Sequence, residues 1–225
     1  MVCVHLSGEE EGTSFAELTA PARQPLAAAP PLLCEEGSTS LGVTMDPRYP
    51  IGKFNWSGSS SPEERSRFIE EIAATPQHMR SAVAGLNSMQ LDTPYRDGGW
   101  TVRQVIHHVP DSHMNSYIRF KFALTEHEPT IKPYDEAVWA ELVDARTAPI
   151  EPSLNLLEGL HHRWILLLRS LSGEDVKRKF YHPELGVVTI EQYIALYAWH
   201  GKHHVAHIMS LRERQGWHQR NGGVT

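Results

Sequence analysis

Histidine is the residue type in this chain whose number and spacing best suit chemistry. There are 14 histidines among 225 residues, and seven of them lie in two short groups. The denser group is the segment Trp199–His207, which reads WHGKHHVAH. Because residues four apart in an α-helix share one face, this segment offers two candidate chelating pairs. The pairs are His200 with His204 and His203 with His207.

The apolar residues around this segment favour one of the two pairs. At about 100° per residue, the apolar side chains between Tyr193 and Leu211 define one face of a helix. His200 and His204 fall within that face, whereas His203 lies well off it. A buried polar group without a partner costs about 1–3 kcal/mol, so two buried imidazoles need hydrogen bonds or a metal. We therefore expect His200 and His204 to point inward and to bind a metal ion.

A third ligand is expected from the other histidine group, which reads VIHHVPDSH. Valines at positions 102, 105 and 109 define the inner face of this helix, with His108 at its edge and His107 turned away. Three neutral imidazoles from two helices suit Zn²⁺ or Ni²⁺ and leave a coordination position for water or substrate. The candidate metal ligands are therefore His108, His200 and His204, with one divalent ion per subunit.

The remaining histidines of the patterned region receive no ligand role. They are interpreted as solvent-facing side chains, as hydrogen-bonded core residues or as partners of the ligands. This group comprises His113, His161, His162, His182, His203 and His207.

A polar stripe follows His108 along the same helix. Ser112, Asn115 and Arg119 lie four, seven and eleven positions after it. The stripe either lines a substrate pocket beside the metal or forms a partly exposed edge of the fold. Asp111 is the nearest carboxylate in the sequence, and no role is assigned to it.

Four amphipathic helices are predicted to position these residues. Ser61, Thr101 and Thr189 each begin the pattern S/T-x-x-E/Q, which is typical of a helix N-terminus. A further helix with a leucine stripe is expected to begin after Ser153 as its cap, and the last helix to end before Gly216. Pro76 is expected to kink or split the first helix.

The connections between these helices complete the prediction of the fold. A long connection runs from Glu128 to Pro152, with a short helix near Glu136–Leu142, and no strand pattern is long enough to build a sheet. We therefore predict an all-α protein, a four-helix bundle with a long crossover connection.

Composition limits the classes of protein to consider. The chain has 21 Lys+Arg against 27 Asp+Glu, a net charge of -6 and 40% hydrophobic residues, which is typical of one soluble globular domain. The absence of a basic block argues against nucleic-acid binding, and the short apolar stretches argue against a membrane span. We expect a disordered extension over residues 1–44 and one domain over residues 45–225, with Met45 as a hypothetical alternative start. Both cysteines, Cys3 and Cys34, fall in the extension, which indicates a reducing, cytoplasmic setting.

Several blocks of this sequence agree in order and spacing with a known family. They are LDTPYRDGGWTVRQVIHHVPDSHMNSYIRFK, KPYDEAVWAEL, FYHP and LYAWHGKHHVAHI. Through them the chain, from about Tyr49 to Trp217, resembles the DinB-like superfamily and specifically its YfiT-type branch of metal-dependent hydrolases. The resemblance implies a four-helix bundle, a cytoplasmic homodimer and one zinc or nickel ion bound by three histidines, which correspond here to His108, His200 and His204. Pro110 departs from the family pattern, and we expect a kink there that tilts His108.

Three functions remain open from the sequence. The first is a metal-dependent hydrolase in which the metal activates water against a small-molecule substrate. The second is a metal-dependent S-transferase that joins a low-molecular-weight thiol, such as bacillithiol, to small electrophiles, with the polar stripe anchoring the carboxylates of the thiol. The third is a non-catalytic bundle in which the metal has only a structural role and holds the helices together.

Overall fold

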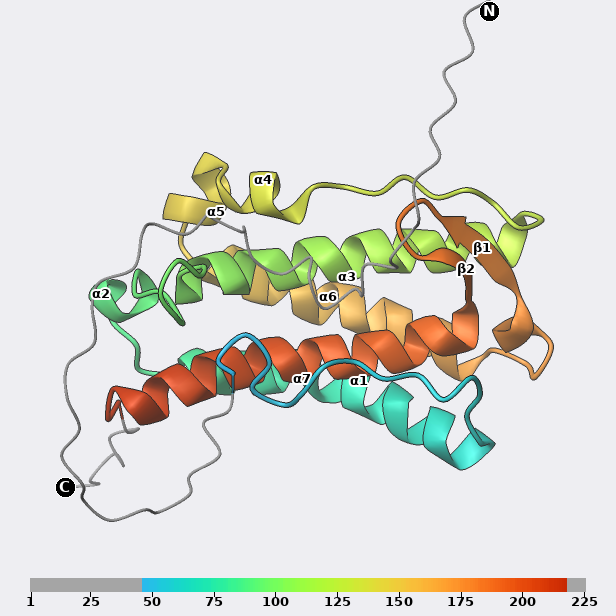
Figure 1. Ribbon diagram of the computed structural model, residues 1–225, viewed down its shortest axis with the longest axis horizontal. Helices are drawn as coiled ribbons and strands as arrows, with labels where there is room; N and C mark the ends of the chain where they lie inside the picture. The colour runs from blue at the N-terminus through green and yellow to red at the C-terminus, as the bar shows by residue number, and fades with distance from the viewer. Residues whose placement is uncertain (1–45, 218–225) are drawn as a thin grey trace, which may run out of the picture.

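The computed structural model of this protein describes residues 46–217 (Figure 1). The predicted extension over residues 1–44, the Met45 start and both cysteines lie outside the described residues. The helices are α1 (Pro62–Val83), α2 (Ser88–Leu91), α3 (Val102–Thr125), α4 (Glu136–Ala140), α5 (Val143–Thr147), α6 (Glu151–Arg169), the 3-10 turn η2 (Asp175–Lys177) and α7 (Ile190–Arg214). Two strands, β1 (Lys179–His182) and β2 (Gly186–Thr189), precede α7.

The three predicted caps are confirmed. The Ser61 hydroxyl accepts from the Glu64 backbone N–H, and the Glu64 carboxylate accepts from that of Ser61, which closes a capping box on α1. Thr101 forms the same arrangement at the start of α3, and the Thr189 hydroxyl caps α7. These bonds satisfy backbone donors that a helix start leaves without partners.

The prediction of Ser153 as a cap is wrong. Helix α6 begins earlier, at Glu151, and Pro152 occupies its first turn, where the fixed φ of proline suits a helix and its missing N–H costs nothing. Ser153 is therefore inside the helix, and its hydroxyl bonds the Nδ1 atom of His107 at 2.7 Å.

Neither internal proline splits its helix. Helix α1 continues through Pro76 from Pro62 to Val83, and α3 continues through Pro110 from Val102 to Thr125. Both helices are long and packed on two others, and this packing holds them together across the missing hydrogen bond.

The four long helices form a bundle in which each packs on two others. Helix α1 packs against α6 and α7, and α3 packs against the same two. Followed along the chain in Figure 1, α1 and α7 run one way along the bundle and α3 and α6 run the other way. Successive helices α3 and α6 are therefore parallel neighbours, so the segment between them must return along the whole bundle. That segment carries α4 and α5 over the outer side of α3, which confirms the predicted bundle with a long crossover connection.

The short strands were not expected, and the prediction of no sheet is wrong at this point. Strands β1 and β2 pair antiparallel, from Lys179 opposite Thr189 to His182 opposite Gly186. Gly186 follows the three-residue loop with φ +72°, a left-handed conformation that glycine adopts without strain. The hairpin closes one end of the bundle, and Tyr181 pairs with Thr130 of the crossover segment.

The core consists of two apolar clusters with a layer of histidines between them. One cluster, toward the hairpin, includes Phe120, Trp164 and Tyr193. The other, toward α2, includes Met79 and Trp100. Among the described residues, no helix is both long enough and apolar enough to cross a membrane.

Candidate metal centre

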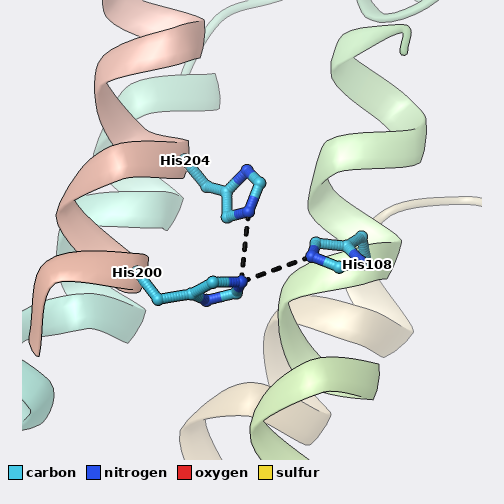
Figure 2. Close-up of side chains that lie close together, drawn as sticks. All are labelled: His108, His200 and His204. Atoms are coloured by element: carbon cyan, nitrogen blue, oxygen red, sulfur yellow. Dashed lines mark hydrogen bonds between the residues drawn. The ribbon is translucent and has the colours of Figure 1, made fainter. Parts of the chain in front are cut away.

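Helices α3 and α7 bring three imidazoles together in the histidine layer. Figure 2 shows His200 and His204 on α7 facing His108 across the gap between the two helices. The Nε2 atom of His200 lies 3.4 Å from Nε2 of His108 and 3.2 Å from Nε2 of His204. The candidate ligand atoms all lie within 4.8 Å of one another, and no other such group of His, Cys, Asp or Glu occurs among residues 46–217.

These spacings fit a divalent metal ion. A tetrahedral site with metal–nitrogen distances of about 2.0–2.1 Å separates its ligand nitrogens by about 3.3–3.4 Å. The two measured Nε2 separations, 3.4 and 3.2 Å, lie close to that value. Without an ion, His200 Nε2 faces two other nitrogens and can share at most one proton with them. The donor set therefore fits Zn²⁺ or Ni²⁺, the ions that imidazole ligands suit.

The three imidazoles are neutral at physiological pH. Burial, followed by the electrostatic influence of His207, lowers the pKa of His108 to about 3. Burial and neighbouring histidines hold the pKa values of His200 and His204 well below the ordinary value. A metal ion binds only to an imidazole nitrogen that carries no proton. Because these imidazoles are already neutral at neutral pH, they can bind a metal ion without first losing the extra proton of the charged form.

The backbone of α7 next to the site depends on a close helix contact. A Cβ atom built on Gly201 would lie 2.5 Å from Oγ1 of Thr75 in α1. Glycine at this position therefore allows α7 to approach α1 closely, one residue after His200.

Two other histidines extend the site behind His200. Nδ1 of His200 lies 3.0 Å from Nε2 of His113, and Nδ1 of His113 lies 2.8 Å from Nε2 of His161. Both are fully buried and hydrogen-bonded, in keeping with two of the alternatives predicted for them.

The remaining histidines lie in other surroundings. His162 is exposed on α6, while His203 and His207 are buried on another side of α7. His107, expected to turn away from the inner face, is buried against α6 and the end of α5, because α3 is covered on that side too. Its Nε2 atom donates to the backbone carbonyl of Ala148.

A small cavity of about 30 Å³ lies next to the imidazole cluster. This volume is enough for one or two water molecules. The crossover segment and the hairpin cover it from the outside. Its lining residues are His108, Ser112, Arg119, Pro133, Tyr134, Glu136, His182, Glu184, Tyr197 and His200.

The predicted polar stripe divides at this cavity. Ser112 and Arg119 line it, whereas the Asn115 amide donates to the backbone carbonyl of Asp111 one turn earlier and does not line it. The pKa of Asp111 is raised to about 6 by burial, and this residue too lies outside the lining.

Arg119 places a buried positive charge beside the cavity. Its guanidinium donates to the Tyr193 hydroxyl at 2.7 Å and to the backbone carbonyl of Lys132 at 3.1 Å. Both acceptors are neutral, and within the described part of the chain Arg119 forms no ion pair. The cavity therefore has a cationic wall that suits an anionic group.

Among the residues that line the cavity, Glu136 is a carboxyl group with a strongly raised pKa. Burial raises its pKa to about 7, with the nearby Glu184 and Asp135 carboxylates adding to the shift. Sequence reasoning assigned no role to Glu136, Tyr134, His182 or Glu184. They lie on the crossover and the hairpin, whose course cannot be predicted from helical periodicity. The one signal for Tyr134, Glu136 and His182 was membership of the blocks KPYDEAVWAEL and FYHP, and Glu184 directly follows the second block.

A helical bundle with three buried imidazoles converging from two helices defines a candidate metalloprotein. The sequence model of the DinB superfamily matches residues 71–208, and the chain belongs to this superfamily. A protein from Bacillus cereus (strain 03BB102) named "Putative metal-dependent hydrolase" is 56% identical over 172 residues, which cover 76% of this chain and 99% of the relative. A relative of the same description from Bacillus mycoides (strain KBAB4) is 55% identical over 172 residues, with the same shares of the two chains covered.

A solved structure is similar as well. YfiT from Bacillus subtilis, described as "a probable metal-dependent hydrolase with an unusual four-helix bundle topology", is 51% identical to this chain. The superposition has a TM-score of 0.74 and covers 76% of this chain and 98% of YfiT.

Proposed function

We propose that this protein is a metal-dependent hydrolase that acts on a small molecule carrying an anionic group. The observation that carries the proposal is the convergence of the Nε2 atoms of His108, His200 and His204 at 3.2 and 3.4 Å, next to a cavity. The names of the Bacillus relatives support the same class of activity. The expected ion is Zn²⁺ or Ni²⁺, one per subunit.

When bound, a divalent metal supplies a Lewis acid and brings the pKa of a coordinated water down to about 7. The residues of the chain then supply binding and proton transfer. With its pKa raised to about 7, Glu136 takes up a proton from the attacking water and returns it to the leaving group. This role is supported by the position of Glu136, which lines the same cavity as His108 and His200.

Arg119 and Ser112 position the substrate in this proposal. A buried guanidinium bonded only to neutral oxygens attracts a carboxylate or phosphate more strongly than an exposed one, because little water competes. The Ser112 hydroxyl, 3.3 Å from that of Tyr197, adds a neutral donor nearby. The cavity holds only water-sized guests, so the substrate has to displace water and part of the crossover segment on entry.

The second candidate function is a metal-dependent S-transferase that uses a low-molecular-weight thiol. The buried charge of Arg119 favours it, because the carboxylates of such a thiol fit the same cationic wall. In either case a homodimer in the cytoplasm, as expected for YfiT-type proteins, is part of the proposal, and the mass in solution tests the dimer.

The test measures turnover of the metal-loaded protein on a panel of activated esters, amides and alkyl electrophiles, each with and without cellular thiols. Thiol-independent hydrolysis that stops on chelation supports the hydrolase, whereas turnover that requires a thiol supports the S-transferase. If chelation abolishes folding and the metal-loaded protein converts no substrate of the panel, the metal has only a structural role and both proposals fail. Glu141→Gln, on the exposed surface outside the cavity, serves as a control with unchanged turnover.

A further inference from the structure

A chain of three buried imidazoles leads from the candidate metal centre to a backbone carbonyl. It begins at Nδ1 of His200, 3.0 Å from Nε2 of His113. It continues from Nδ1 of His113 to Nε2 of His161 over 2.8 Å. Nδ1 of His161 finally lies 2.8 Å from the backbone carbonyl oxygen of Ile72 in α1. The chain thus joins α7, α3, α6 and α1, the four long helices of the bundle.

The carbonyl at the far end fixes the direction of every hydrogen bond in this chain. A carbonyl only accepts, so Nδ1 of His161 carries a proton and, in the neutral ring, its Nε2 is an acceptor. That acceptor requires a proton on Nδ1 of His113, whose Nε2 then accepts from Nδ1 of His200. His200 is left with a lone pair on Nε2, the atom that faces His108 and His204. The opposite direction would place a proton at the centre of the cluster.

Pro76 explains why the carbonyl of Ile72 is available. In an α-helix the carbonyl of one residue accepts from the N–H four positions later, and the residue four positions after Ile72 is Pro76. Proline has no N–H, so the helix itself offers this carbonyl no partner. His161 supplies the partner from α6, and α1 continues through Pro76.

The surroundings keep these rings neutral and in place. His113 is 0% exposed and His161 1% exposed, and their hydrogen-bonded rings are nearly coplanar, with an angle of 17° between the planes and centroids 5.0 Å apart. Trp164 packs edge-on against both. Burial lowers the pKa of His161 to about 4, so this ring carries one proton at neutral pH. The candidate ligand His204 lacks such a support, because its Nδ1 atom has no hydrogen-bond partner among the described residues.

We propose that His113 and His161, anchored on the Ile72 carbonyl that Pro76 leaves free, are positioning residues that hold His200 with its Nε2 lone pair directed at the metal. This inference rests on the proposed metal-binding function of His200 and deepens it. A partner on the far nitrogen of a ligand imidazole fixes both its tautomer and its orientation, and losing such a partner typically weakens metal binding about 10- to 100-fold.

The first test compares His161→Phe with His162→Phe, which replace neighbouring histidines on α6. Only His161 belongs to the hydrogen-bonded series of imidazoles, whereas His162 is exposed. Metal affinity is measured by competition with a chelator, together with the thermal midpoint of the apo protein. We expect His161→Phe to bind Zn²⁺ about 10- to 100-fold more weakly and His162→Phe to match the wild type. A folded His161→Phe protein with wild-type affinity overturns the inference.

The second test needs no metal and does not depend on the phenylalanine variants. ¹⁵N-histidine NMR of the apo protein reports which ring nitrogen carries the proton, with the His200 signals assigned by comparison with His200→Ala. We expect His200, His113 and His161 all to be protonated on Nδ1. A His200 protonated on Nε2 overturns the inference even if the phenylalanine variant fails to fold. A wild-type protein that binds no metal but shows the expected tautomers contradicts the proposed function and leaves the hydrogen-bonded chain standing.

Discussion

Helix α7 carries two histidine pairs of identical spacing that differ in what surrounds them. His200 and His204 are 2% and 1% exposed, and His203 and His207 are 0% and 1% exposed. Spacing and burial therefore do not distinguish the two pairs. In the first pair, Nε2 of His200 lies 3.2 Å from Nε2 of His204 and 3.4 Å from that of a third imidazole, His108, and His200 lines a cavity together with His108.

The second pair packs against aromatic rings and backbone. His203 stacks on Trp199 with ring centroids 4.3 Å apart, and His207 stacks on Tyr95 at 4.0 Å. Nε2 of His207 donates to the carbonyl of Arg48, while both ring nitrogens of His203 have no partner among the described residues. Imidazoles in such surroundings act as flat core side chains. A metal site is therefore recognised by lone pairs that converge from different helices, and neither the repeat nor the burial of the histidines is sufficient.

The largest expected effect comes from the same substitution in adjacent residues of the two pairs. His204→Phe removes one of three ligands, so we expect bound Zn²⁺ to fall well below one equivalent and affinity to drop by more than about a hundredfold. His203→Phe removes two buried nitrogens without partners, so we expect full metal binding and an unfolding free energy unchanged or raised by about 1 kcal/mol. Metal analysis and denaturant unfolding of both variants measure this difference. Loss of metal in His203→Phe, with retention in His204→Phe, would show that the second pair binds the metal and would contradict the proposed site.

The next largest effect concerns proton transfer, which we expect only on the side of α7 that carries His200 and His204. Glu136 lines the cavity on the His200 side, and burial raises its pKa to about 7. As a base it acts only when ionised, so kcat/KM rises with pH up to about 7 and then levels. Glu136→Gln removes this inflection and lowers kcat about 100-fold or more. Glu184→Gln, at the same cavity, is the matched control: it keeps the inflection but moves it to lower pH, because the Glu184 carboxylate adds to the raised pKa of Glu136. An unchanged pH profile in Glu136→Gln contradicts the proposed role.

The same carboxyl predicts a dependence of folding stability on pH with a definite sign. The pKa of Glu136 is about 7 in the folded protein and about 4.3 in an unfolded chain, so the native state binds the proton more tightly. Its contribution to stability is complete below about pH 4.3 and is lost as the pH rises through 7. Because the side chain is partly exposed, we expect Glu136→Gln to be more stable than the wild type at pH 8, relative to pH 4, by on the order of 1 kcal/mol. Denaturant unfolding at the two pH values measures it.

The long helices could be predicted because their signals are local. The hydroxyls of Ser61, Thr101 and Thr189 each cap a helix within three residues of themselves. The same rule failed at Ser153, because α6 already begins at Glu151 with Pro152 in its first turn, and the Ser153 hydroxyl bonds a histidine from α3. A capping residue is thus recognised reliably only where no better start precedes it.

The site could be predicted in part for a related reason. An angular count assumes that a helix has one buried face, which was enough to direct His200 and His204 inward. It placed His203 off that face and His107 away from the core, whereas α3 and α7 are covered on several sides and both histidines are buried. The crossover residues at the cavity and the link from Pro76 to the histidine layer depend on tertiary contacts, which no local period encodes.

The smallest expected effect tests whether Asn115, the middle residue of the polar stripe on α3, contributes to the site. Ser112 lines the cavity, whereas the Asn115 amide lies one turn further along and donates to the Asp111 carbonyl at 2.9 Å. Asn115→Ala loses only this local bond on a partly exposed helix, so we expect an unfolding free energy within about 0.5 kcal/mol of the wild type and an unchanged KM. Ser112→Ala removes a hydroxyl from the cavity wall and is expected to raise KM about fivefold, equivalent to one neutral hydrogen bond of about 1 kcal/mol. Steady-state kinetics on the substrate found in the panel compares the two. A larger rise in KM for Asn115→Ala than for Ser112→Ala would mean that the bound substrate contacts Asn115, outside the cavity, and would contradict the division of the stripe.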